Sequence, residues 1–199
     1  MQATVPESLQ LLEASWHVIR DEALAMHAWM FPWNNRSIYR SGWFLGPFYS
    51  HTRRVRGRFV RECPVTIGLL DQLMADDTLG LVTAGFSCLA PHSTTHLHRN
   101  VDGYAWRVYL GLDIPEGDVG LEIDGITHRW RPGRCLVWDP TLPHRAWNNS
   151  ERDRHILLLD VFRPEHPRDE MDAMMHRITA QQSTESIGFT GQRLPEDVG

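Results

Sequence analysis

The sequence predicts a single-domain, mainly β protein whose strands form a sandwich or a closed jelly-roll barrel with flanking α-helices. Three observations lead to this prediction. The length of 199 residues is typical of one domain, because domains contain about 150 residues on average. Between residues 80 and 165, short β-rich runs alternate with turn signals, which is typical of all-β folds. Residues 6–78 and 166–180 contain segments with the periodicity of helices.

Residues 6–78 are expected to form a region of helices and loops that supports the β core. A helix is predicted over residues 6–29, because Pro6 suits a first helical position and apolar residues recur about every 3.6 residues. Residues 31–64 carry Pro, Gly and Asn without a sustained period, so loops with one or two short strands are expected. Thr66 is predicted to cap a short helix that ends near residue 76.

The β core is predicted to span residues 80–165. Its expected strands cover residues 81–89, 105–113, 119–124, 127–130, 134–139, 144–147 and 154–162. The Asp124-Gly125 pair is a hairpin signal between two of them. A last helix is expected over residues 166–180, and the polar residues 181–199 are expected to form a loose tail.

Composition limits the class of protein. The net charge of −5 does not indicate a nucleic-acid binder or a protein that binds acidic membranes. The chain shows no long apolar stretch and no signal peptide at its start, so a soluble cytoplasmic protein without a membrane partner is expected. Its oligomeric state cannot be derived from these features. Cys63, Cys88 and Cys135 are widely spaced, and we expect them to be reduced core residues.

His144 and Arg154 are the first candidates for chemistry, because they flank the polar segment 148–150. If the chain folds back with residue 149 at the tip, the two residues face each other across neighbouring strands, with Cβ atoms about 4.5 to 5.5 Å apart. A metal ligand would then lie beside a guanidinium that can grip a carboxylate. The alternative is that Arg154 is a solvated strand residue or pairs with a nearby acidic side chain.

His98 offers a second imidazole from a strand that precedes His144. Two sheets could therefore converge on one metal ion, since imidazole is a common ligand of iron, zinc, copper and nickel. His96 would share a face with His98 if this segment is extended. A single histidine is more often a surface or hydrogen-bonded residue, and the chain has 11 of them, so spacing alone leaves both interpretations open.

The same residues resemble the aspartyl/asparaginyl β-hydroxylase family, and several of their spacings match that family. The resemblance covers residues 80–165 and rests on Ser87, His98, Arg107-Val-Tyr-Leu-Gly-Leu-Asp-Ile-Pro115, Gly133, Trp138-Asp139, His144, Arg154 and Asp160-Val-Phe-Arg-Pro164. Residues 16–22 and 63–66 resemble the upstream region of the family more weakly. The resemblance implies a double-stranded β-helix of the cupin-like kind and an oxygenase that depends on Fe(II) and 2-oxoglutarate.

Carried over by position, the resemblance implies a role for each of five residues. His98 and His144 would hold the Fe(II). Ser87 and Arg154 would bind the distal carboxylate of 2-oxoglutarate, and Arg107 would line the same pocket. Many such oxygenases add a carboxylate ligand two residues after the first histidine, where this chain has an asparagine. Since only two protein ligands remain, iron and 2-oxoglutarate are expected to bind with positive coupling.

The expected reaction is hydroxylation of an unactivated C–H bond with O₂ as co-substrate and release of succinate and CO₂. The expected substrate is a small molecule or an amino acid bound to a carrier or peptide. A peptidyl aspartate is not favoured, because Ala105 and Tyr109 stand where the family has an arginine and a histidine. The five arginines at residues 53–61 form either a solvated loop or a lid that meets an anionic substrate.

Two other functions fit the same residues. A cupin-type metal dioxygenase or isomerase would use His96, His98, Asp102 and His144 as ligands and would need no 2-oxoglutarate. A jelly roll that binds a sugar or another ligand without catalysis would use no iron chemistry. Asp139 is interpreted as a turn residue or as a residue that supports the metal ligands from behind, because Pro140 follows it.

Overall fold

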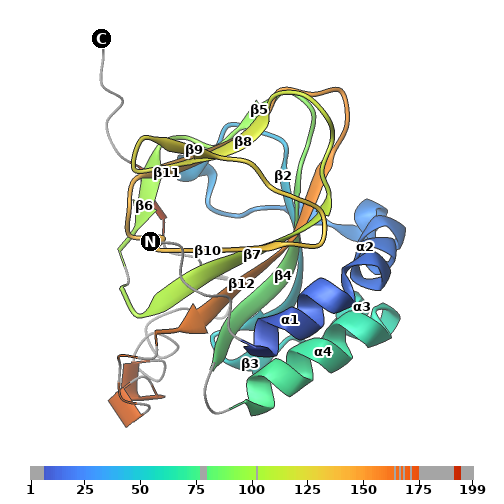
Figure 1. The fold of residues 1–199 in the computed structure, drawn as a ribbon, viewed down its shortest axis with the longest axis vertical. Coiled ribbons are helices and arrows are strands. Elements are labelled where there is room, and N and C mark those ends of the chain that lie inside the picture. The colour runs from blue at the N-terminus through green and yellow to red at the C-terminus, as the bar shows by residue number, and fades with distance from the viewer. Residues whose placement is uncertain are drawn as a thin grey trace.

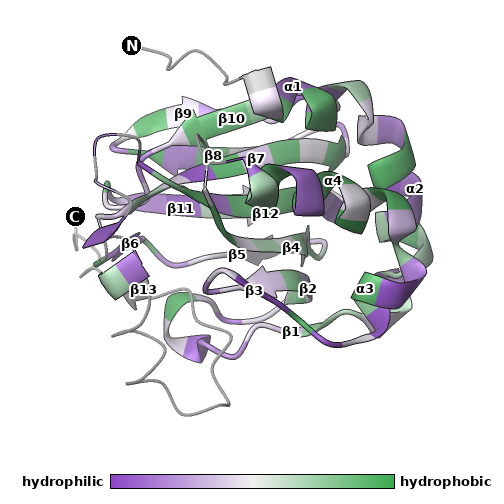
Figure 2. Ribbon diagram, turned by 90° about the horizontal axis from the view of Figure 1, so that it is seen from below, coloured by the Kyte–Doolittle hydropathy of each residue, from purple (hydrophilic) through white to green (hydrophobic). Residues whose placement is uncertain are grey.

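Two antiparallel sheets face each other, and helices cover the outer face of the larger one (Figure 1). Figure 2 shows the same arrangement from below. The computed structural model describes residues 7–76, 80–101, 103–163, 165, 167, 169–170, 172–174 and 191–193. The prediction of a mainly β jelly roll with flanking helices is confirmed. None of the helices in this described part of the chain has the length and apolarity that a membrane-spanning segment needs.

The larger sheet has seven strands in the order β1-β2-β4-β12-β7-β10, with β3 beside β2. Its strands are β1 (Phe31–Pro32), β2 (Trp43–Ser50), β3 (Arg53–Arg54), β4 (Leu81–Leu89), β7 (Ala105–Asp113), β10 (Cys135–Trp138) and β12 (Arg154–Phe162). The bounds of β4, β7 and β12 are those that the sequence predicts. The strand β2 is longer than the short strands expected before residue 64, since it has eight residues and pairs with β4 along most of its length.

The smaller sheet has six strands in the order β13-β6-β11-β8-β9, with β5 beside β11. Its strands are β5 (Ser93–Thr94), β6 (His98–Asn100), β8 (Val119–Ile123), β9 (Ile126–His128), β11 (His144–Asn148) and β13 (Gly191–Arg193). Composition predicted a loose tail at residues 181–199, but residues 191–193 form β13 and pair with β6. The other tail residues and most of the predicted helix 166–180 lie outside the described residues.

The single helix predicted over residues 6–29 is wrong. The structure has α1 (Glu7–Ala14), α2 (Trp16–Ala25) and the short 3-10 helix η1 (His27–Trp29), and Pro6 lies outside the described residues. The break at Ser15 lets the end of α1 contact the sheet. There the Glu13 carboxylate accepts the backbone N–H of Cys135 at 2.7 Å and a guanidinium N–H of Arg134 at 3.0 Å.

The helix predicted to begin at Thr66 is α4 (Pro64–Ala75), which follows α3 (Arg58–Glu62). A further 3-10 helix, η2, covers Arg36–Ile38. Thr66 does not cap α4. Instead the side chain of Glu22 in α2 caps α4. Its carboxylate accepts hydrogen bonds from the backbone N–H groups of Val65 and Thr66 at 2.9 and 2.8 Å. Because these N–H groups have no partner inside the helix, a carboxylate from another helix satisfies them.

The strands β4, β7 and β12 are buried on both faces, which positions the site. On the helix side, Phe86, Leu110 and Leu157 pack into one hydrophobic cluster with α1, α2 and α4. On the inner side, Tyr109 and Leu158 belong to a second cluster with the smaller sheet. Successive strand residues point to opposite faces, so the inner positions in the middle of these strands are the odd residues of β4 and β7 and the even residues of β12.

Replacing Glu22 by alanine is expected to lower the free energy of unfolding by about 1 to 2 kcal/mol, because α4 loses its cap. Urea denaturation followed by circular dichroism measures this change. The matched control is Asp21→Ala on the same helix, whose carboxylate pairs only with the neighbouring Arg20 among the contacts described. Equal losses in the two variants would contradict the capping role.

Candidate active site

His98 and His144 lie next to each other in the smaller sheet. They are direct partners in the antiparallel pair β6–β11, and their ring centroids are 4.1 Å apart. Both side chains are buried and face the space between the two sheets. The two imidazoles that the sequence singles out therefore meet inside the barrel.

The predicted hairpin that would place His144 opposite Arg154 is wrong. The strands β11 and β12 belong to different sheets, and the residues between them carry the chain from one sheet to the other. The side-chain amide of Asn148 shapes this crossing by donating to the carbonyls of Leu89 and Arg152, both at 2.8 Å. His144 and Arg154 still face the same interior, but from opposite walls.

The hydrogen bonds of the two histidines leave the same ring nitrogen available in each. Nδ1 of His98 donates to the carbonyl of His96 at 2.7 Å, and Nδ1 of His144 donates to the carbonyl of Leu142 at 2.8 Å. Since a carbonyl only accepts, Nδ1 carries the proton and Nε2 keeps its lone pair. Nε2 of His144 is buried and has no partner among the described residues. Histidines that bind metals are typically arranged in this way.

Burial keeps both imidazoles neutral. Desolvation lowers the pKa of His98 to about 4. The pKa of His144 also lies well below its usual value. Desolvation is the main cause, and electrostatic repulsion from the nearby His98 is the second. Neutral imidazoles are the form that binds transition metals. The pair could therefore hold a divalent metal ion through two Nε2 atoms.

Arg154 is a buried cation that has no anionic partner among the described residues. Its side chain is 3% exposed, and its Nε and Nη1 have no hydrogen-bond partner among the described residues. Its guanidinium carbon lies 4.8 Å from the ring centre of Trp130. Burial lowers the pKa of Arg154 to about 10, so the group is still charged at neutral pH. An uncompensated buried charge is costly, and a bound carboxylate would remove the cost.

Ser87 lies beside Arg154 on the inner face. In the pair β4–β12, Ser87 is opposite Ile156 and Leu89 is opposite Arg154, so Ser87 is a diagonal neighbour of the guanidinium. The Ser87 hydroxyl accepts the indole N–H of Trp43 at 3.0 Å. Its own O–H is then oriented to donate to another acceptor. This pair of donors could bind one carboxylate.

Arg107 is buried in a different way, because it is paired. Its Nε and Nη2 donate to the two carboxylate oxygens of Asp160, at 2.8 and 3.0 Å. Although burial lowers the pKa of Arg107, the Asp160 carboxylate and Tyr109 together outweigh burial and raise the pKa. The sequence analysis missed this role of Asp160. The signal was an acidic residue at an inner position directly after an apolar run of four residues in β12.

Aromatic rings connect the two ends of the interior. The ring centroids of Trp138 and His144 are 4.5 Å apart. The ring centroid of Tyr109 lies 5.5 Å from that of Trp138 and 6.3 Å from that of Trp130. Burial raises the pKa of Tyr109, so its phenol is uncharged. The interior thus runs from the histidine pair, past Tyr109, to Arg154.

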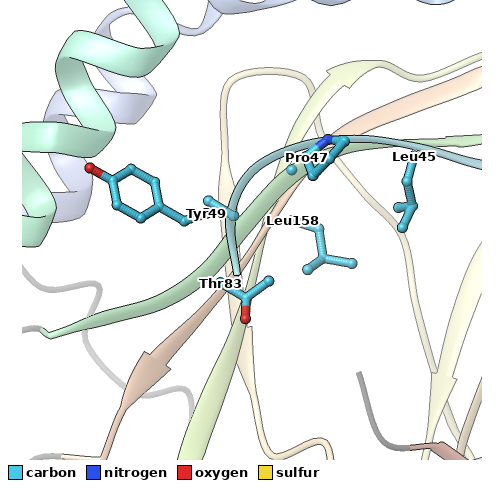
Figure 3. A pocket seen from close by; sticks show the side chains of 7 residues that line it. Leu45, Pro47, Tyr49, Thr83 and Leu158 are labelled. Atoms are coloured by element: carbon cyan, nitrogen blue, oxygen red, sulfur yellow. The ribbon is translucent and has the colours of Figure 1, made fainter. Parts of the chain in front are cut away.

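A small apolar pocket opens from the inner side of β2, β4 and β12. Leu45, Pro47, Thr83, Ala84, Gly85 and Leu158 line it together with Tyr49. Figure 3 shows Leu45 and Leu158 beside this space, whereas the ring of Tyr49 points toward the helices. Since Thr83 pairs with Asp160 across the strands, the pocket lies near the Arg107–Asp160 pair.

The remaining candidates lie elsewhere. The chain bends between His96 and His98, and His96 does not join His98 and His144 in any metal-sized group within the described residues. Asp102 lies outside the described residues. Asp139 is a turn residue, as predicted, because its Oδ1 accepts the backbone N–H and hydroxyl of Thr141 at 2.9 and 2.7 Å.

The arginines at residues 53–61 are exposed on β3, on α3 and in the segment between them. Arg54 forms an ion pair with Asp71 of α4 at 3.3 Å, and Arg58 lies 3.6 Å from the ring centre of Trp29. α3 packs on the helix side of the larger sheet through Phe59. This run therefore lies across the sheet from His98 and His144, which does not favour a lid over them.

The sequence matches the family model described as aspartyl/asparaginyl beta-hydroxylase over residues 13–164. Two curated relatives are similar. An ornithine lipid ester-linked acyl 2-hydroxylase of Rhizobium tropici is 29% identical over 107 residues, which are 53% of this chain and 36% of that protein. An aspartyl/asparaginyl beta-hydroxylase of Homo sapiens is 26% identical over 165 residues, which are 80% of this chain and 21% of that protein. The chain therefore spans well under half the length of both relatives.

Among solved structures, a prolyl-4-hydroxylase of Pseudomonas putida shares the fold. Its TM-score is 0.53 at 18% sequence identity, and the match covers 76% of this chain and 87% of that chain. At this identity the similarity concerns the arrangement of the two sheets.

Replacing Asp160 by asparagine is expected to lower the free energy of unfolding by about 3 to 5 kcal/mol, because Arg107 is left as an uncompensated buried charge. Denaturant titration measures the loss. The control is Asp113→Asn at the exposed pair with Arg152, where the change should stay below about 1 kcal/mol. If the free energy of unfolding falls equally in the two variants, the buried Arg107–Asp160 pair stabilises the fold no more than the exposed pair does.

Proposed function

The chain belongs to the aspartyl/asparaginyl β-hydroxylase family, and on this premise we propose that it is an Fe(II)- and 2-oxoglutarate-dependent oxygenase. The proposed reaction hydroxylates an unactivated C–H bond and releases succinate and CO₂. One observation carries the proposal. Two neutral, buried imidazoles and a buried guanidinium that has no anionic partner in the described part of the chain face the same interior.

His98 and His144 are proposed to hold the iron through Nε2, since their Nδ1 protons are held by backbone carbonyls. Asn100, two residues after His98, is buried on the same strand and provides no carboxylate. When Fe(II) is bound with 2-oxoglutarate and O₂, it supplies the oxidising power that no side chain has. The chain itself supplies a closed interior and fixed orientations.

Arg154 and Ser87 are proposed to bind the distal carboxylate of 2-oxoglutarate. The Nε and Nη1 atoms of Arg154 are adjacent donors of one planar guanidinium, which suits a carboxylate held by two hydrogen bonds. The Ser87 hydroxyl adds a third donor. Arg107, held in place by Asp160, is proposed to line the same pocket near the histidine pair.

The cupin-type alternative is less well supported. It requires three histidines and a carboxylate around one metal ion, and His96 is not grouped with His98 and His144 among the described residues. It also assigns no ligand to the Arg154 guanidinium. A buried cation in the same interior as the metal ligands is accounted for by an anionic co-substrate that spans from the metal to Arg154.

For the substrate, we propose an amino-acid-like small molecule or an amino acid bound to a carrier or peptide. The named relatives hydroxylate an ornithine lipid in one case and aspartyl or asparaginyl residues in the other. Tyr109 is a neutral phenol between Trp130 and Trp138, so this wall of the interior is aromatic rather than charged. An aromatic wall favours the less polar part of such a substrate.

Anaerobic addition of Fe(II) and then 2-oxoglutarate is expected to produce the visible charge-transfer absorption of a chelated 2-oxo acid. Admission of O₂ should then yield succinate. His98→Ala and His144→Ala should abolish both signals, whereas the control His96→Ala should keep them. Well-folded protein with neither signal would rule out the proposed function, and a silent His96→Ala variant would favour the cupin-type centre.

Arg154→Lys is expected to weaken 2-oxoglutarate binding about tenfold to a hundredfold. A point charge replaces a fork of two donors, and hydrogen bonds to charged groups contribute about 1.5 to 3 kcal/mol. Titration of the charge-transfer absorption measures the affinity. Arg145→Lys is the matched control, because Arg145 is exposed and pairs with Glu122 on the surface. An affinity unchanged by Arg154→Lys would contradict the clamp.

A further inference from the structure

A second group of metal-binding side chains lies on the other side of the larger sheet. Cys88 of β4 and His155 of β12 are direct partners in the antiparallel pair, and His27 of η1 lies over them. The possible ligand atoms of these three residues all lie within 4.8 Å of one another. Cys88 and His155 are buried, whereas the His27 side chain is 43% exposed.

This group is separate from the candidate active site. Cys88 follows Ser87, and His155 follows Arg154, and successive strand residues point to opposite faces. Ser87 and Arg154 face the interior, so Cys88 and His155 face the helix side. The sheet itself therefore lies between this group and the pair His98–His144.

The two imidazoles are arranged as ligands of one ion. Nδ1 of His27 and Nε2 of His155 are 3.1 Å apart. Two nitrogens bound to one zinc ion at about 2.0 to 2.1 Å in tetrahedral geometry lie at about the same separation. The other nitrogen of His27 lies 3.6 Å from the Asp153 carboxylate. A carboxylate near Nε2 favours the proton on that nitrogen and leaves the Nδ1 lone pair toward His155, which is the orientation that carboxylates give to histidines in many zinc sites.

We propose that His27, Cys88 and His155 form a second metal site that takes Zn²⁺. One sulfur and two imidazole nitrogens are a ligand set that suits this borderline-soft ion. The exposed side of His27 leaves room for water as a fourth ligand and gives the ion a way in. The bound ion would connect the segment after α2 to the strands that carry Ser87 and Arg154.

Titration of metal-free full-length protein with Co²⁺, which replaces Zn²⁺ and absorbs light, tests the site. The expected result is a saturable thiolate-to-cobalt charge-transfer absorption in the near ultraviolet that disappears when Zn²⁺ is added. The double variant His98→Ala/His144→Ala should keep this absorption, because the iron site contributes no thiolate. The outcome is thus independent of the proposed oxygenase activity.

Cys88→Ser should abolish the thiolate absorption. Cys135→Ser is its matched control, because Cys135 lies on the same sheet outside the group and should leave the absorption unchanged. Since a buried substitution can impair folding, His27→Gln at the partly exposed position provides a second test. It should weaken Zn²⁺ binding at least about tenfold in competition with a chromophoric chelator.

The proposal is overturned by any of four results in folded protein. The wild type could show no thiolate absorption at millimolar Co²⁺. The absorption could survive Cys88→Ser or disappear in Cys135→Ser. Alternatively, His27→Gln could bind Zn²⁺ as tightly as the wild type.

Discussion

The contrast between two buried arginines organises the interior of this protein. Arg107 is neutralised within its own sheet by Asp160, its direct partner on the neighbouring strand. Arg154 enters the same interior, and the described residues offer no acceptor to its Nε or Nη1. A fold tolerates a buried charge of this kind when a ligand completes it, since burial removes the water that would otherwise solvate the charge. The interior therefore contains two neutral imidazoles on one wall and a buried cation on the other, which suits the dicarboxylate proposed as co-substrate.

The central strands are able to serve two sites because both of their faces are buried. One face packs on α1, α2 and α4, and the other faces the smaller sheet. Adjacent residues of one strand thus enter different environments. Ser87 and Arg154 face the proposed 2-oxoglutarate site, whereas their neighbours Cys88 and His155 face the proposed zinc site. A change in β4 or β12 would reach both sites through the same backbone.

Carboxylates hold the helix layer onto this sheet. Glu13 accepts the backbone N–H of Cys135 at the start of β10, and Glu22 caps α4. Gly133 completes the contact, because its φ of 73° suits glycine and a Cβ there would lie 2.6 Å from Cδ1 of Trp16. The cap from Glu22 also joins the two upstream segments with a weaker resemblance to the family, residues 16–22 and 63–66, by direct hydrogen bonds.

The sequence by itself determined the mainly β fold and the bounds of β4, β7 and β12, because strand periodicity and turn residues are local properties. It also singled out the five candidate residues, because the motif spacings are read along the chain. Only the tertiary structure decided which strands face each other. The turn at residues 149–153 reads as a hairpin, but it crosses between sheets because the Asn148 amide binds the carbonyls of Leu89 and Arg152. The tertiary structure also paired Asp160 with Arg107, gave α4 a cap from Glu22, and brought His27 to Cys88 and His155. Each of these contacts joins residues far apart in the chain. Local sequence patterns reflect only the conformation of nearby residues, so they do not predict such contacts.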